Sequence, residues 1–335
     1  MDKITPQPGI MDIKLYVSGE SAVEGKSDVL KLSANENPYG FSDKAREAFT
    51  RSVQNLHRYP NTDHAPLRNA ISKVYDIDPN RIICGVGSDE VLQFVAQAYA
   101  GIGDEIIVTE HGFAMYPILA HAVGATPIEV AEKERRVDVH AILDAVTEKT
   151  RIVFIANPAN PTGTFLDEAE LLTLIEGLPA SVILVLDGAY TEFAEGYNGG
   201  VHLVDQYPNL IMTRTFSKIY GLGGLRIGWG YAQQDMINVL LRLRQPFNLS
   251  EPQMEAAAAA VQDIDFTQKC QVENAKWREW LRNALVQMGV SCDKSYANFV
   301  LARFESEKDA AACDAALRRM ASSYAVPPVI SCRIA

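Results

Sequence analysis

The order in which strand-like and helix-like segments alternate constrains the fold of this chain more than any other feature. Short apolar segments typical of buried strands are expected at 81–84, 105–109, 126–130, 151–156, 182–186 and 210–212. Helices are expected before and between them, at 43–56, 66–75, 91–100, 117–123, 139–145 and 168–176. Strands that alternate with helices form a mainly parallel sheet covered on both faces, so the predicted fold class is α/β.

Composition narrows the class of protein further. The 335 residues are 47% hydrophobic and 22% charged, which suits one large core and a smaller domain. The net charge of -11 disfavours nucleic acid and anionic membranes as partners. We expect a cytoplasmic protein, because the chain has no apolar run of about 18 residues and no segment that resembles a signal peptide. Neither the histidines nor the cysteines show metal-ligand spacing, so no metal is expected and the thiols should be reduced: Cys84, Cys270, Cys292, Cys313 and Cys332.

Four polar residues each lie just past the end of a predicted strand. They are Ser88, Asn160, Asp187 and Lys218, and the last three are each about one strand-helix-strand repeat apart. Ligands of such sheets bind outside the carboxyl ends of the strands. We therefore expect these side chains to meet in one site.

The segment 213–218, with Arg226 close behind, suggests the chemistry of that site. A lysine amine forms an imine with the aldehyde of pyridoxal phosphate, and an arginine holds phosphate by a two-pronged fork. Taken alone, Ser217-Lys218 is more often a solvated loop. The turn 85–90 could cradle phosphate at a helix N-terminus, or be only a tight turn. It is not a dinucleotide fingerprint, because Glu90 replaces the third glycine, which argues against a nucleotide-binding oxidoreductase.

An ordered set of motifs makes the chain recognisable. It includes Asn35-Glu36-Asn37-Pro38, Arg58-Tyr59-Pro60, Gly87-Ser88-Asp89-Glu90, Asn160-Pro161-Thr162-Gly163, Asp187-Gly188-Ala189-Tyr190, Ser217-Lys218 and Gly224-Leu225-Arg226-Ile227-Gly228. In this order they resemble the pyridoxal-phosphate-dependent aminotransferases of fold type I, and more narrowly their histidinol-phosphate aminotransferase branch. The resemblance extends to about residue 318. It implies a large domain with a seven-stranded, mainly parallel sheet between helices, and a smaller α+β domain.

The resemblance also implies roles for residues around the cofactor ring. Lys218 would hold pyridoxal phosphate through its aldehyde and then move the substrate's proton. Asp187 would face the ring nitrogen and keep it protonated, since a buried carboxylate stabilises that cation. Tyr190 and Asn160 would hydrogen-bond the ring oxygen, and Phe113 would stack on the ring, although a core phenylalanine is the alternative. Catalysis is thus assigned to Lys218, Asp187 and Tyr190.

Other matching residues would hold the phosphate and the substrate. The phosphate would be bound by the backbone of Ser88 and Asp89, the hydroxyls of Thr215 and Ser217, and the guanidinium of Arg226. Tyr59 matches a tyrosine that the family donates to the neighbouring subunit's phosphate, which implies a homodimer. Tyr16 matches the family's substrate-arm tyrosine, and Asn160 would also contact the substrate.

The implied reaction is transamination between histidinol phosphate and 2-oxoglutarate, in histidine biosynthesis, with an amino-acid-like phosphate ester and glutamate among the substrates. Three alternatives remain: an aromatic amino-acid aminotransferase, a decarboxylase of an amino-acid phosphate that also uses this cofactor, and a catalytically impaired protein that binds the cofactor. The expected domains are an N-terminal arm with part of the small domain (1–40), the large cofactor-binding domain (41–245) and the small domain (246–335).

Two positions depart from the family pattern. Gly188 follows the aspartate where the family has alanine or an acidic residue, and we expect it only to loosen the strand end. After about residue 318, an unrelated tail replaces the family's arginine-bearing strand. Codons chosen for residues 320–329, when they are read in a shifted frame, encode a segment that resembles that strand. A frameshift would leave the small domain incomplete, and Arg333 is not assigned to the substrate carboxylate. We expect cofactor binding to survive, because its residues precede 227, and turnover to be weak.

Overall fold

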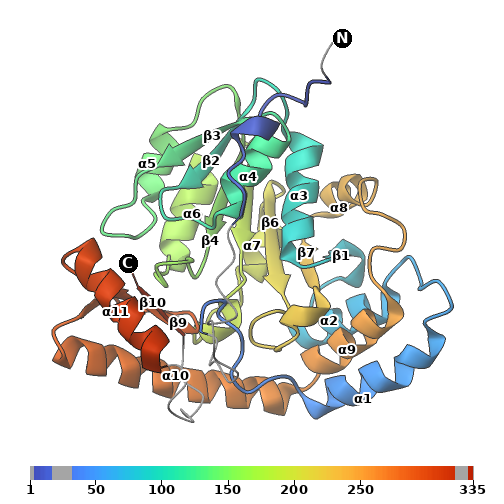
Figure 1. The fold of residues 1–335 in the computed structure, drawn as a ribbon. Helices are drawn as coiled ribbons and strands as arrows, with labels where there is room; N and C mark the ends of the chain where they lie inside the picture. Colours follow the sequence, from blue (N-terminus) through green and yellow to red (C-terminus); the bar gives the residue numbers. More distant parts are fainter. Residues whose placement is uncertain (1–3, 17–31, 321–330, 335) are drawn as a thin grey trace.

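A seven-stranded sheet forms the centre of the molecule in this computed structural model, which describes residues 4–16, 32–320 and 331–334 (Figure 1). The strand order is β1-β7-β6-β5-β4-β2-β3. Only β7 runs antiparallel to its neighbours, and the other four pairs are parallel. The predicted mainly parallel sheet is thus confirmed. Its strands are β1 (Ile82–Gly85), β2 (Glu105–Thr109), β3 (Thr126–Val130), β4 (Thr150–Ala156), β5 (Ile183–Asp187), β6 (Leu210–Thr215) and β7 (Gly228–Tyr231).

Strand β5 shows why the central strands are apolar along their whole length. Ile183 and Val185 belong to the core on one face of the sheet, and Leu184 and Leu186 belong to the core on the other. All five residues of the strand are buried. Since both faces are covered, alternation of polar and apolar residues is lost.

Helices cover the two faces of this sheet (Figure 1). One core is closed by α3 (Ser88–Tyr99), α4 (Met115–Ala122) and α8 (Gln234–Leu240). The other core contains side chains of α1 (Asp43–Ser52), α2 (Ala65–Tyr75), α5 (Val139–Asp144), α6 (Glu168–Gly177), α7 (Val201–Gln206) and α9 (Glu251–Val261). Two predicted helix starts are confirmed by side-chain caps: Ser42 accepts from the amide of Ala45, and Asp167 forms a capping box with Glu170.

The structure differs from the sequence-based expectation at two places beside the strand ends. Helix α3 begins at Ser88 rather than near 91, because Gly87 caps it with a positive φ of 83°. The segment 225–230 has a strand-like sequence, but the strand begins only at Gly228, because Arg226 adopts a left-handed conformation with φ 54°. The first difference places the backbone amides of the first turn of α3 near the carboxyl end of β6, and the second places Arg226 there.

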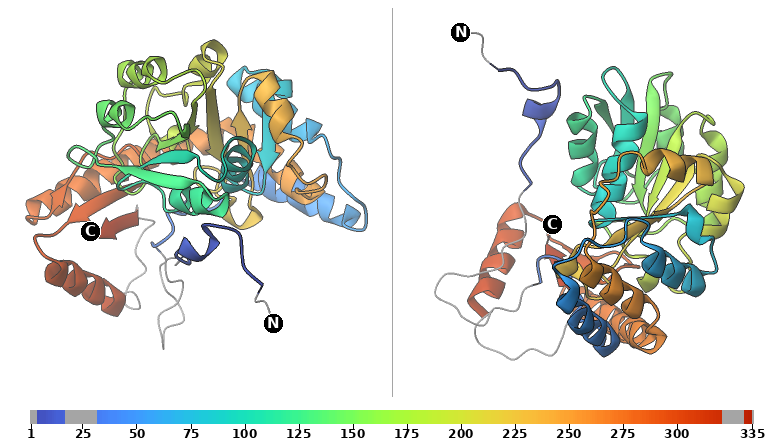
Figure 2. Two further views of the ribbon diagram at one scale, coloured as in Figure 1. Left: turned by 90° about the horizontal axis from the view of Figure 1, so that it is seen from above. Right: turned by 90° about the vertical axis from the view of Figure 1, so that its right-hand side faces the viewer.

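A second, three-stranded sheet lies beside the first, and α11 (Glu307–Met320) follows β9 in the chain (Figure 2). We call it the small sheet; its strands are β8 (Ser291–Cys292), β9 (Phe299–Arg303) and β10 (Ser331–Ile334). The long helix α10 (Ile264–Gln287) leads into it and packs against β8 and β9.

The altered tail contributes to the small sheet. Strand β10 pairs in parallel with β9, so the tail supplies at least one strand, whereas we expected the family's strand to be missing there. The segment 321–330, which carries the frameshift hypothesis, lies outside the described residues. None of the helices in the described ranges is long and apolar enough to cross a membrane.

Candidate active site

The four polar residues predicted to meet do line one pocket, at the carboxyl ends of the strands. Ser88 follows β1, Asn160 follows β4, Asp187 ends β5 and Lys218 follows β6. Most of the other predicted site residues line the same pocket: Tyr16, Asp89, Phe113, Tyr190, Thr215, Ser217 and Arg226.

Tyr59 is the exception among the predicted residues. Its side chain is 82% exposed and packs against Phe247, with ring centroids 4.6 Å apart, outside the pocket of this single chain. A role for Tyr59 at this site therefore requires a second copy of the chain.

Lys218 is held inside the pocket by the turn that ends β6. Phe216 is fully buried, and the amide of Ser217 donates to Thr215 Oγ1 (3.1 Å), which fixes that turn. The Nζ of Lys218 donates to the carbonyl of Ala34 (2.9 Å) and lies 5.6 Å from the centroid of the Tyr190 ring. The amine is thus presented to the pocket from a rigid strand end.

Asp187 is a buried carboxylate at the end of β5. Burial raises the pKa of its carboxyl from 3.8 to about 6, although the hydrogen bonds from Tyr116 and Thr213 oppose this shift. Tyr116 donates to Oδ2 (2.9 Å) and Thr213 donates to Oδ1 (3.1 Å). A carboxylate so far from water would be stabilised strongly by a cationic group placed beside it.

Tyr116 is a site residue that sequence reasoning missed. It stacks on Phe154 with centroids 5.0 Å apart, and Phe113 meets its ring edge-on at 5.7 Å. Burial, reinforced by the neighbouring Asp187, raises the pKa of Tyr116 well above its usual 10, so the phenol remains a donor. Its position in α4, just after the end of β2, was the available signal, because β2 ends at the same edge of the sheet.

An anion site lies where the first turn of α3 meets Arg226. The guanidinium donates to Ser217 Oγ through Nη1 (3.2 Å) and to Asp89 Oδ2 through Nη2 (2.9 Å). Gly87 has a φ of 83°, which favours glycine, and a Cβ there would lie 2.7 Å from that Nη2. Helix N-terminal amides, a hydroxyl and an arginine together suit a phosphate.

Two further polar residues, Tyr190 and Asn160, line the pocket. The hydroxyl of Tyr190 accepts a hydrogen bond from Asn35 Nδ2 (2.9 Å). No described residue offers a hydrogen bond to the buried Oδ1 of Asn160, although this atom is shielded from solvent. A buried polar group of this kind points to a ligand that would satisfy it.

These residues fit pyridoxal phosphate. The anion site suits its phosphate, Asp187 suits a protonated ring nitrogen, Lys218 suits its aldehyde, and the side-chain NH2 of Asn160 suits the ring oxygen as a donor.

The surroundings of Gly188 contradict one sequence-based expectation. A Cβ at this position would lie 2.5 Å from Thr191 Oγ1 and 2.9 Å from the carbonyl oxygen of Thr213. The backbone amide of Gly188 also donates to that carbonyl (2.9 Å). The expectation that glycine loosens the strand end is wrong, since close packing against β6 requires it.

Comparison with known proteins agrees with this site. A family model described as aminotransferase class I and II matches residues 27–333. The chain is 59% identical to a histidinol-phosphate aminotransferase of Ruegeria pomeroyi, over 98% of this chain and 93% of the relative. It is 57% identical to one of Cereibacter sphaeroides, over 97% and 92% respectively. The chain therefore belongs to the class I and II aminotransferase family, and within it to the histidinol-phosphate aminotransferases.

Solved structures show the same fold. A histidinol-phosphate aminotransferase of Sinorhizobium meliloti in complex with pyridoxal 5'-phosphate has a TM-score of 0.80 and 26% identity, over 87% of this chain and 79% of that one. An aspartate aminotransferase of Thermus thermophilus with maleate has a TM-score of 0.72 and 20% identity, over 81% and 75% respectively, and shares the fold.

Proposed function

We propose that this chain transfers an amino group between histidinol phosphate and 2-oxoglutarate, with pyridoxal phosphate held at Lys218. The observation that carries the proposal is the meeting of Lys218, Asp187 and the anion site at one sheet edge. The identity of 59% to a histidinol-phosphate aminotransferase supports this choice of substrate.

Bound pyridoxal phosphate supplies an electron sink that makes a hydrogen on the substrate's α-carbon acidic. The residues of this chain supply the rest. Lys218 Nζ moves that proton, and Asp187 keeps the positive charge on the ring nitrogen through a carboxylate shielded from water. Burial of Asp187 strengthens the attraction, because few waters screen it.

The remaining pocket residues would orient the cofactor and bind the substrate. Arg226, Ser217, Thr215 and the first turn of α3 would hold the phosphate and so keep the cofactor in the pocket. Phe113 covers the ring, and Asn160 and Tyr190 fix its oxygen. Tyr16, at the opening of the pocket, contacts the substrate.

We also propose that the working unit is a homodimer in which Tyr59 reaches the partner's phosphate. Tyr59 is exposed in the single chain. An apolar hollow that a second copy could cover is lined by Phe41, Phe49, Leu222 and Leu225. Leu222 and Leu225 follow Lys218 closely in sequence. A cytoplasmic location is supported by the free thiols Cys84, Cys270, Cys292 and Cys313. We further propose that residues 41–245 form the large cofactor-binding domain and that residues 246–335 form the small domain.

The experiment is a half-reaction followed by absorbance. The protein loaded with pyridoxal phosphate is mixed with histidinol phosphate, with phenylalanine or with threonine phosphate, in the absence of 2-oxoglutarate. The proposal predicts rapid loss of the visible band with histidinol phosphate and its return when 2-oxoglutarate is added. A faster reaction with phenylalanine would contradict the proposal and indicate an aromatic amino-acid aminotransferase. Release of carbon dioxide from threonine phosphate would contradict it and indicate a decarboxylase of an amino-acid phosphate. Lys218→Ala serves as the control that should not react.

A further inference from the structure

The loop 34–40 lies between the catalytic lysine and the small sheet, and it is tied to both. The carbonyl of Ala34 accepts from Lys218 Nζ (2.9 Å). Asn37 Nδ2 donates to the carbonyl of Ile219 (2.7 Å) and to Cys270 Sγ in α10 (3.3 Å). The loop therefore contacts the catalytic lysine, the residue that follows it and the helix that leads to the small sheet.

Asn35 lies near the start of this loop in an unusual conformation. Its φ is 53°, in the left-handed region, and it is only 1% exposed. Asparagine tolerates this region better than most residues do, but the conformation still costs free energy. The surrounding contacts must hold it there.

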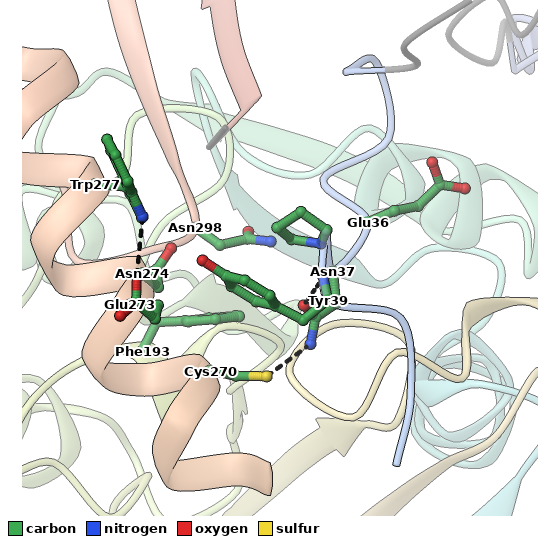
Figure 3. Close-up of a pocket in the computed structure, with 10 residues that line it drawn as sticks. Glu36, Asn37, Tyr39, Phe193, Cys270, Glu273, Asn274, Trp277 and Asn298 are labelled. Atoms are coloured by element: carbon green, nitrogen blue, oxygen red, sulfur yellow. Dashed lines mark hydrogen bonds between the residues drawn. The ribbon is translucent and has the colours of Figure 1, made fainter. Parts of the chain in front are cut away.

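Two hydrogen bonds of Asn35 connect distant parts of the chain. Its side-chain Nδ2 donates to the hydroxyl of Tyr190 (2.9 Å), and its carbonyl accepts from Asn298 Nδ2 (3.0 Å), one residue before β9. Figure 3 shows the side chain of Asn298 extending toward the loop that carries Asn37 and Tyr39. Asn35 thus links the small sheet to the hydroxyl of Tyr190 by hydrogen bonds.

The phenol of Tyr190 can donate only one hydrogen bond. Its ring is buried and meets Phe299 edge-on at 5.2 Å, so the ring position is fixed and only the O–H can rotate. Because Asn35 already donates to the oxygen, the phenolic hydrogen must point elsewhere, and Tyr190 lines the pocket.

We propose that Asn35 is a positioning residue, which turns the O–H of Tyr190 toward the cofactor's ring oxygen and is itself locked by Asn298 from the small sheet. This inference rests on the proposed function, because it takes the ring oxygen as the acceptor. Asn35 acts on the reaction only through Tyr190, and Asn298 acts only through Asn35.

The test measures the pH midpoint at which the visible band of pyridoxal phosphate bound to Lys218 changes. A hydrogen bond donated to the ring oxygen withdraws electron density and makes the nitrogen bonded to Lys218 less basic, which lowers the midpoint. Asn35→Gly removes the amide but tolerates the left-handed φ. We expect the midpoint to rise by roughly 0.4 to 1 pH unit, the effect of losing one ordinary hydrogen bond.

The variant Tyr190→Phe calibrates this result and separates the two proposals. It should raise the midpoint by at least as much as Asn35→Gly, and the double variant should show no further rise. If Tyr190→Phe changes the midpoint but Asn35→Gly does not, or if the two shifts add, the positioning role of Asn35 is overturned and the proposed function stands. If Tyr190→Phe leaves the midpoint unchanged, the role proposed for Tyr190 fails together with this inference.

Asn298 has a matched control in the chain. Asn298 and Asn274 are both buried asparagines next to the small sheet, but Asn274 donates to the carbonyl of Ala297 instead of to Asn35. Asn298→Ala should raise the midpoint, and Asn274→Ala should not. Equal shifts in both variants would show a general loosening of the small sheet and would overturn the link through Asn35. Circular dichroism of each variant confirms that it is folded.

Discussion

The burial of Asp187 predicts that the cofactor-free protein is destabilised by its own active site. The unfolded carboxyl ionises near 3.8 and the folded one at about 6. The contribution of this group to stability is therefore fully present below pH 3.8 and is lost as the pH rises through 6. A difference of roughly two pH units at about 1.36 kcal/mol each corresponds to about 3 kcal/mol.

Replacing Asp187 with asparagine should remove this cost. The side chain keeps its shape, and the hydroxyls of Tyr116 and Thr213 can still pair with it. Without cofactor, the Asp187→Asn variant should be more stable than the unaltered protein at pH 7.5, by up to about 3 kcal/mol. At pH 4.5 the difference should be much smaller, because much of the folded protein's carboxyl is then protonated.

Urea unfolding of both cofactor-free proteins at the two pH values measures this difference. Addition of pyridoxal phosphate should reverse the order at pH 7.5, because only the carboxylate can pair with a protonated ring nitrogen. A variant that is no more stable than the unaltered protein at pH 7.5, or a difference that does not grow with pH, would refute the reasoning from burial.

Three further predictions concern the rest of the site. Arg226→Gln should weaken binding of pyridoxal phosphate by roughly 10- to 100-fold, the loss of one charge-assisted hydrogen bond, in an absorbance titration; unchanged affinity would place the phosphate elsewhere. Gly188→Ala should lower the free energy of unfolding by about 1–3 kcal/mol through overpacking against Thr213, and equal stability in urea would contradict the packing argument. Mixed dimers of Tyr59→Phe and Lys218→Ala chains should recover activity, since one site then has both native residues; no recovery would mean that Tyr59 acts within its own chain.

Much of the fold could be predicted from local sequence. The strands at 105–109 and 126–130 have the predicted bounds. The first is a short apolar run between turns, which specifies a buried strand. The strand ends also indicated which polar residues meet, since parallel strands bring their carboxyl ends to one edge. Asp187 and Lys218 were found in this way.

The parts that could not be predicted depend on contacts between segments far apart in the chain. Tyr116 donates a hydrogen bond to Asp187, which lies 71 residues later, and Asn35 donates one to Tyr190, which lies 155 residues later. The need for glycine at 188 appears only when β6 is placed beside it. The left-handed conformation of Arg226 also had no local signal, because no glycine or asparagine occupies that position.

The central claim is that Lys218 would hold pyridoxal phosphate through its aldehyde, and that the amino group of histidinol phosphate would replace Lys218 there and free the lysine. The most direct measurement is borohydride reduction of the loaded protein followed by peptide mapping, before and after histidinol phosphate is added. We predict that the cofactor is fixed to Lys218 in the first sample and that this lysine is left unmodified in the second. Cofactor fixed to another residue, or labelling of Lys218 that histidinol phosphate does not reduce, would contradict the account.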